Sequence, residues 1–183
     1  MEFMQARSFE ALEFTELVFV TVGNATQGFK RLLNAVDEAA GQGLFGDEPI
    51  FLQTGNNPDF HATHCEQQSF LPMSQFEALL RDSSLIISHG GAGTLINILR
   101  AGRVPVVMPR RREYSEHVDD HQVELIQALA KEGRVVPVFE SEGLKGAVEE
   151  ARHRNEQPRA QSNSQLVGLV ARAIEELSGD KKE

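Results

Sequence analysis

Ser88-His89-Gly90-Gly91-Ala92-Gly93-Thr94 is the stretch that decides the fold of this chain. It follows an apolar run, Ser84–Ser88, that is typical of a strand buried on both faces, and it leads into Thr94–Arg100, whose pattern indicates a helix. Glycines let the backbone approach a ligand, and a helix amino end offers unpaired N–H groups and partial positive charge. A glycine cluster can be a plain connector, but open α/β sheets bind ligands at the carboxyl ends of their strands, which favours an anion site here.

Strand and helix patterns alternate on both sides of this stretch. This alternation predicts parallel βαβ units, and therefore an α/β fold with a Rossmann-like parallel sheet and helices on both faces. The predicted strands are 17–22, 50–53, part of 65–71, 84–88, 104–108 and 134–138, and the predicted helices are 29–40, 73–81, 94–100, 118–131 and 142–152.

The domain boundaries follow from the same patterns. We expect residues 17–152 to form one Rossmann-like domain and residues 1–16 to be an amino-terminal extension. Residues 153–183 should hold a polar linker and a last helix, because apolar residues recur at helical spacing between 166 and 177.

Composition excludes several classes of protein. The 183 residues include 18 Lys+Arg and 27 Asp+Glu, a net charge of −9, which argues against a nucleic-acid partner. Cys65 is the single cysteine, so no internal disulfide is possible and a reducing, cytoplasmic location is expected. No apolar run approaches the roughly 20 residues that span a bilayer, and 1–16 does not resemble a signal peptide. Any membrane anchor should therefore come from a partner.

The glycine spacing separates the nucleotide-binding classes. A dinucleotide fingerprint starting at Gly91 would need glycine at Ile96, and the 23–28 loop lacks the P-loop lysine because Phe29 stands there. Gly23 ends the first predicted strand, so its loop should border the same crevice.

A second candidate stretch, 109–122, follows another buried strand. Arg110 and the next two arginines could neutralise a diphosphate or touch an acidic lipid headgroup, or could form a solvated turn. His117, Asp120 and His121 would share one face of a helix, where they could hold a metal or hydrogen-bond sugar hydroxyls. We favour the hydroxyls and expect no metal. Ser88 and His89 point to opposite faces of a strand, so an acyl-transfer pair is disfavoured.

Four segments together resemble glycosyltransferase family 28, carboxyl-terminal domain. They occur in the family's order between about residues 17 and 152 and are 20–23 (VTVG), 70–72 (FLP), 87–94 (ISHGGAGT) and 120–122 (DHQ). Within the family, 116–122 is most similar to the small catalytic subunits of bacterial exopolysaccharide and capsule transferases. These in turn resemble the soluble subunit of the eukaryotic enzyme that adds the second N-acetylglucosamine to the dolichol-linked oligosaccharide.

The resemblance implies the donor-binding half of an inverting GT-B glycosyltransferase that uses a UDP-sugar and no bound metal or other cofactor. The other half would be a membrane-anchored subunit that binds a lipid-linked saccharide acceptor, which would hold this chain at the inner face of the membrane. It further implies a role for each matching position. Gly90, Gly91, Ala92, Gly93 and Thr94 would hold the UDP diphosphate, Ser88 and His89 would line the pocket, His121 and Gln122 would contact the sugar, and Asn97 stands where the peptidoglycan member has a ribose-binding glutamate.

Two alternatives remain open at this stage. The chain could be a catalytically silent nucleotide-sugar-binding or enhancer subunit of a membrane transferase. It could also be an unrelated Rossmann-like enzyme, which a preference for adenine nucleotides would support. The sequence leaves the donor sugar, the linkage and self-association through a partner surface undecided.

Overall fold

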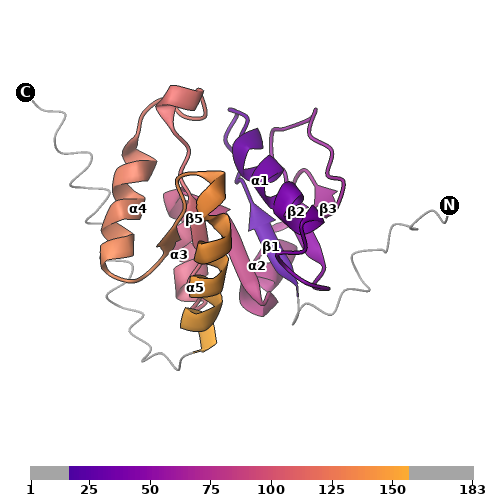
Figure 1. Cartoon of the computed structure of the whole chain (residues 1–183). Helices are drawn as coiled ribbons and strands as arrows, with labels where there is room; N and C mark the ends of the chain where they lie inside the picture. The colour runs from indigo at the N-terminus through magenta and orange to yellow at the C-terminus, as the bar shows by residue number, and fades with distance from the viewer. Residues whose placement is uncertain (1–16, 157–183) are drawn as a thin grey trace, which may run out of the picture.

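The computed structural model describes residues 17–156, so the predicted extension 1–16 and the predicted helix within 166–177 lie outside the described residues. One sheet of six parallel strands runs through this part of the chain, in the order β3-β2-β1-β4-β5-β6 (Figure 1). The strands are β1 (Val18–Thr21), β2 (Ile50–Gln53), β3 (Glu66–Gln68), β4 (Leu85–His89), β5 (Val106–Met108) and β6 (Val136–Pro137). The predicted Rossmann-like fold is confirmed.

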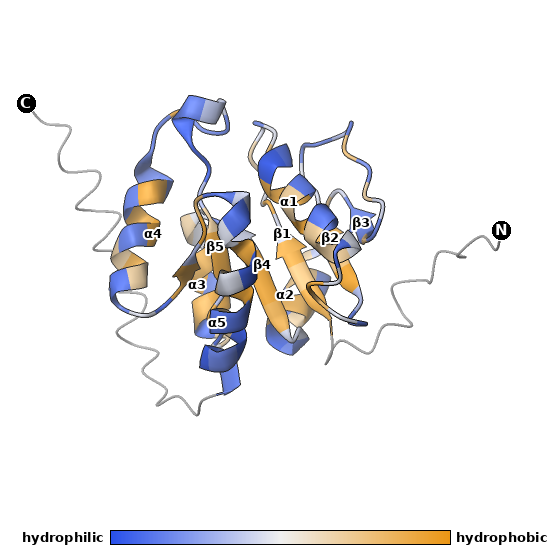
Figure 2. Cartoon of the chain, viewed as in Figure 1, coloured by the Kyte–Doolittle hydropathy of each residue, from blue (hydrophilic) through white to orange (hydrophobic). Residues whose placement is uncertain are grey.

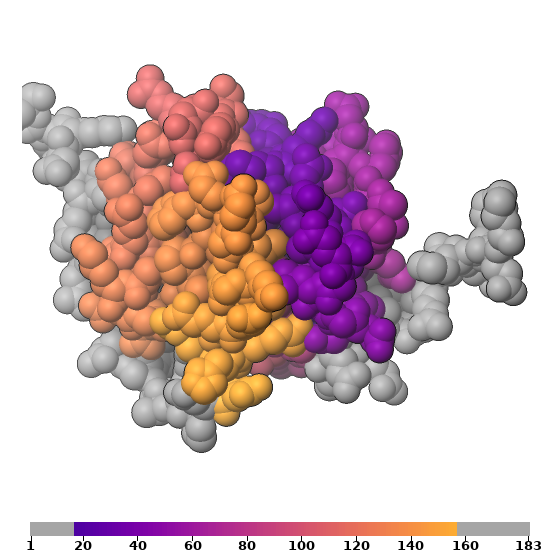
Figure 3. All heavy atoms as spheres, in the orientation of Figure 1, coloured from indigo at the N-terminus to yellow at the C-terminus, as the bar shows by residue number. Residues whose placement is uncertain are grey.

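Helices cover both faces of the sheet. They are α1 (Lys30–Gly41), α2 (Met73–Asp82), α3 (Ala92–Arg100), α4 (His121–Lys131) and α5 (Leu144–Glu156), with short 3-10 helices η3 (Arg112–Tyr114) and η4 (Ser141–Gly143). Helices α1 and α5 lie side by side over one face (Figure 3). Helices α2, α3 and α4 pack on the other face.

The pattern of side chains explains this two-sided burial. Successive strand residues face opposite layers, so Val18 and Val20 pack in the cluster with α1 and α5, whereas Phe19 packs with α2 and α3. Every residue of β1 is buried, as expected for a central parallel strand. In Figure 2 the central strands β1 and β4 are hydrophobic, whereas the edge strand β3 and much of the helix surface are polar. None of the helices between residues 17 and 156 is long and apolar enough to cross a bilayer.

Two predicted boundaries are wrong for identifiable reasons. Helix α4 begins at His121 rather than at 118, because the Asp119 carboxylate accepts the His121 N–H (3.2 Å) and the Asp120 carboxylate accepts the Arg112 N–H (3.0 Å). These bonds draw the preceding residues into a folded turn. The helix predicted to end at 152 runs on to Glu156 as α5. Asn155 extends the helix by bonding both the N–H (2.9 Å) and the carbonyl (3.0 Å) of Val104.

Candidate functional site

The glycine loop, residues 90–93, joins β4 to α3 at the carboxyl edge of the sheet. Helix α3 starts at Ala92, earlier than predicted, and Gly91 precedes it with no side-chain hydrogen bond capping the helix. The first N–H groups of a helix have no partner within the helix. This amino end therefore presents uncapped donors and partial positive charge, which suit an anion.

A cavity of about 370 Å³ opens in front of this helix end. We call it the edge cavity. Seven of the predicted site residues line it, and five further residues complete its wall. The seven are Gly23, His89, Gly91, Ala92, Gly93, Thr94 and Asn97, and the five are Asn24, Gln53, Leu71, Met73 and Phe76.

His89 lies between Gly23 and Gly91, two of the three glycines that line the cavity. A Cβ at Gly23 would lie 2.4 Å from the imidazole ring and one at Gly91 would lie 2.2 Å from it, so only glycine fits at either place. Gly23 also has a positive φ of 69°. His89 is 7 % exposed, and its Nδ1 has no hydrogen-bond partner among the described residues. Burial, together with the charge of Arg110, lowers the pKa of His89 to about 4, so the ring is neutral at pH 7.

Ser88, Gly90 and Gln122 are close to the cavity without lining it. Ser88 is fully buried in β4, and its hydroxyl donates to the His89 carbonyl (3.1 Å). A Cβ at Gly90 would lie 3.0 Å from Cβ of Gln122, so the first turn of α4 packs directly on the glycine loop. Gln122 Oε1 accepts the Arg110 N–H (3.1 Å), which leaves its NH₂ as the group that can donate.

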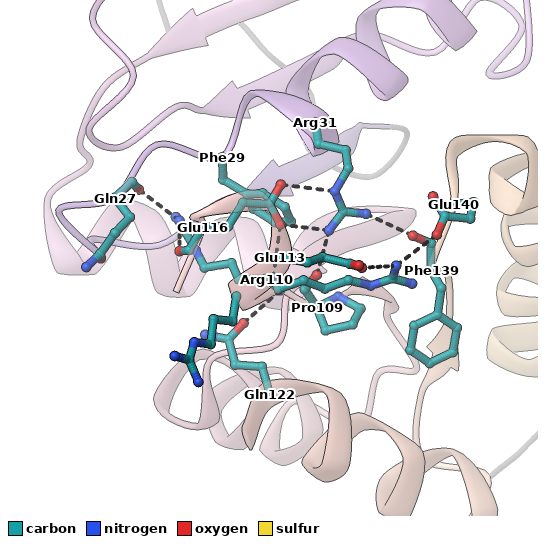
Figure 4. A network of polar contacts seen from close by, with 12 residues as sticks. Gln27, Phe29, Arg31, Pro109, Arg110, Glu113, Glu116, Gln122, Phe139 and Glu140 are labelled. Atoms are coloured by element: carbon teal, nitrogen blue, oxygen red, sulfur yellow. Dashed lines mark hydrogen bonds and ion pairs between the residues drawn. The ribbon is translucent and has the colours of Figure 1, made fainter. Parts of the chain in front are cut away.

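The arginine loop, residues 109–120, follows β5 at the same edge of the sheet. Arg110 is 1 % exposed, and its guanidinium donates to the carbonyls of Val22 (2.9 Å), Gln27 (2.8 Å) and Glu116 (3.2 Å) (Figure 4). Burial lowers its pKa to about 10, so it is charged at pH 7. The prediction that this side chain meets the diphosphate is corrected, because the guanidinium is enclosed by carbonyls and tethers the Gly23 loop.

Arg31, on α1, makes a second set of contacts with the arginine loop. It binds both carboxylate oxygens of Glu116 (3.0 and 2.8 Å) and donates to the carbonyls of Pro109 and Phe139, each at 2.8 Å (Figure 4). Glu116 is 5 % exposed and also accepts the Arg111 N–H (3.1 Å).

Aromatic rings lie between the arginines of this network. Phe29 lies between Arg110 and Arg31 (4.8 and 5.4 Å), and Tyr114 lies between Arg31 and Arg111 (4.8 and 5.7 Å). We call these residues, with Glu116, the arginine network. It ties the arginine loop to α1 and to the loop that precedes α1.

The predicted helical face of His117, Asp120 and His121 does not exist, because only His121 belongs to α4. Asp120 instead lines a separate cavity beside η3, and His117 and His121 both turn Nδ1 toward Asp119 (3.0 and 3.3 Å). No group of His, Cys, Asp or Glu within 17–156 is arranged to hold a metal ion. His61 and His64 are exposed.

Sequence reasoning missed the apolar wall of the edge cavity. Leu71, Met73 and Phe76 come from the turn after β3 and from α2, and Phe76 packs edge-on against Phe19 at 5.7 Å. At helical spacing such residues look like core residues. Gln53 and Asn24 were also missed, although each follows or ends a strand at the carboxyl edge, which was the available signal.

Comparison with known proteins agrees with this geometry. The model of the glycosyltransferase family 28 C-terminal domain matches residues 17–177, so the chain belongs to that family. The chain is 39 % identical over 64 residues to the UDP-N-acetylglucosamine transferase subunit ALG13 of Cryptococcus neoformans var. neoformans serotype D, covering 34 % of this chain and 30 % of the relative. The match thus spans less than a third of that protein.

Two solved glycosyltransferases show the same fold. The glycosyltransferase of kitacinnamycin is 19 % identical with a TM-score of 0.58, over 88 % of this chain and 40 % of that one. MurG of Acinetobacter baumannii is 19 % identical with a TM-score of 0.52, over 89 % of this chain and 51 % of that one. The chain has the Rossmann-like fold of GT-B glycosyltransferases.

Proposed function

We propose that this chain is the UDP-sugar-binding, catalytic subunit of a two-component inverting glycosyltransferase. Its acceptor would be a lipid-linked saccharide held by a membrane-anchored partner subunit, and its product would contribute to a surface polysaccharide. The carrying observation is the edge cavity, which joins an uncapped helix amino end to an apolar wall. A nucleoside diphosphate has the same two-ended chemistry, with an anionic diphosphate at one end and a flat, partly apolar base at the other.

Each end of the cavity has a separate role in this proposal. The N–H groups at the start of α3 would bind the diphosphate and stabilise the negative charge that develops as it leaves. Neutral His89 would line the cavity beside it without adding a charge. Leu71 and Phe76 would cover the base, and Asn97, one turn along α3, would face the ribose.

The match to an ALG13 subunit supports the proposal that the enzyme has two components. UDP-N-acetylglucosamine is therefore the first donor to test. Because the helix end supplies the positive potential, we expect binding without a divalent cation. We also expect the chain to work at the cytoplasmic face of the membrane, held there by its partner.

Calorimetric titration of the full chain tests this function. UDP and UDP-N-acetylglucosamine should bind equally well with and without a chelator, and ADP should bind at least about tenfold more weakly. Equal affinity for ADP would instead support an unrelated Rossmann-like enzyme. The non-catalytic alternative is tested by replacing Gln122 in the assembled pair of subunits, since unchanged turnover would favour a silent enhancer.

A further inference from the structure

Asp119 joins two imidazoles at the start of α4. Its Oδ1 lies 3.0 Å from His117 Nδ1 and accepts the His121 backbone N–H at 3.2 Å, while Oδ2 lies 3.3 Å from His121 Nδ1. The three side chains are each about one-third exposed or less, with values of 27, 30 and 36 % for His117, Asp119 and His121. The cluster is a polar group that solvent can reach.

The carboxylate selects a tautomer. An ionised carboxylate only accepts hydrogen bonds, so a neutral imidazole that contacts it through Nδ1 carries its proton there. The same Nδ1 of His117 also lies 3.4 Å from the Asp119 backbone N–H, which favours the opposite tautomer, but the carboxylate contact is shorter at 3.0 Å. The opposite nitrogen, Nε2, then carries a lone pair. No described residue hydrogen-bonds Nε2 of His117, so this lone pair is free to accept a proton.

The cluster directly precedes the contact between α4 and the glycine loop. Gln122, the next residue after His121, packs against Gly90 at the contact described above. The charge that His117 carries when protonated contributes to the lowered pKa of His89 on the cavity wall, after burial and Arg110. Of the two imidazoles, His117 makes the shorter contact with the Asp119 carboxylate, 3.0 Å against 3.3 Å for His121.

Resting on the proposed function, we propose that His117 is the general base of the transfer and that Asp119 is its positioning residue. Nε2 of His117 takes the proton of the attacking hydroxyl as its oxygen forms a bond to the anomeric carbon. The bond from that carbon to the diphosphate oxygen breaks, and UDP leaves with the electron pair. Without the partner's acceptor, water takes the place of the hydroxyl, so the chain alone should slowly hydrolyse UDP-N-acetylglucosamine to UDP and N-acetylglucosamine.

The first arm of the test is spectroscopic and needs no ligand. Long-range ¹H–¹⁵N correlation of the full chain should show His117 as the Nδ1–H tautomer in the wild type and a shift toward Nε2–H in Asp119→Asn. His61, exposed in its own loop, is an internal reference. An Nε2–H tautomer for His117 in the wild type overturns the proposal.

The second arm measures UDP release from UDP-N-acetylglucosamine together with UDP affinity. His117→Gln should lower the hydrolysis rate at least about tenfold with UDP affinity changed less than about threefold, whereas His61→Gln should change neither. Asp119→Asn should lower the rate in the same way. UDP binding with no hydrolysis by the wild type, or with equal rates for the two histidine variants, overturns this proposal alone. Absence of UDP binding by the wild type overturns the proposed function and this proposal together.

Discussion

The glycine loop and the arginine loop leave neighbouring strands, β4 and β5, at the same edge of the sheet, yet they contribute to the site in opposite ways. The glycine loop offers backbone N–H groups to an open cavity, and its glycines make room for the His89 ring. The arginine loop turns its most conspicuous side chain inward, where Arg110 is 1 % exposed and bound to carbonyls. The loop rich in positive charge thus encloses Arg110 among carbonyls, whereas the uncharged glycine loop borders the edge cavity.

The largest expected effect comes from a substitution in the glycine loop. Gly91→Val would place its Cβ 2.2 Å from the His89 ring, so the ring and the start of α3 must shift. We expect UDP affinity to fall on the order of 100-fold, because both the donors and His89 are displaced. Calorimetry measures the affinity. Gly146→Ala in α5, where a Cβ meets nothing within 4 Å, is the matched control and should keep full affinity.

The next prediction concerns Glu116 in the arginine network. Glu116→Gln leaves the Arg31 guanidinium, whose side chain is 18 % exposed, without its charged partner. The free energy of unfolding should fall by about 3 kcal/mol, measured by urea denaturation. UDP affinity of the folded variant should change less than about threefold, since Glu116 does not line the edge cavity.

Glu113→Gln is the control for that variant. Glu113 belongs to the same loop and pairs with Arg111, but its side chain is 60 % exposed. Its loss should cost less than about 1 kcal/mol. If Glu116→Gln and Glu113→Gln lower the free energy of unfolding equally, the buried ion pair between Arg31 and Glu116 does not stabilise the fold as we describe.

The third prediction concerns the pH dependence of stability. The pKa of His89 is about 4 in the folded chain against an ordinary value of 6.5, so below pH 6.5 the unfolded chain binds a proton that the folded chain does not. Stability should therefore fall as the pH is lowered from 6.5 toward 4, with about 3 kcal/mol assigned to this residue. His89→Gln should show a shallower loss over the same range in urea denaturation. An identical slope would mean that His89 is not held neutral by burial.

The smallest expected effect on UDP affinity is that of replacing Arg112. Arg112 is exposed on the arginine loop. Arg112→Ala should change UDP affinity less than about twofold, because charges at the surface are screened by salt. A loss of tenfold or more would restore the diphosphate role first considered for the arginines.

Much of the fold could be predicted from sequence, because each buried parallel strand is marked by a short apolar run. Runs such as 84–88 and 104–108 are apolar on both faces, so their place in the sheet follows from the pattern. The end of α5 was missed because polar Asn155 is held in the helix by Val104, a partner 51 residues away. The start of α4 was missed because the side chains of Asp119 and Asp120 compete for backbone N–H groups.

The candidate site, like the fold, could be predicted from sequence only in part. The glycine loop could be predicted because its chemistry belongs to the backbone and needs only a strand before it and a helix after it. The position of Arg110 could not, because its burial depends on carbonyls of Val22 and Gln27 that come from a distant loop. The apolar wall was hidden because Met73 and Phe76 have the spacing of ordinary core residues on α2.

The most direct test of the central claim is a ¹H–¹⁵N titration of the full chain with UDP. We predict that the largest amide shifts fall on Gly91–Thr94 and Asn24, around the edge cavity, and that the amides of 111–116 move little. The largest shifts on 111–116, with the glycine loop unmoved, would contradict the account.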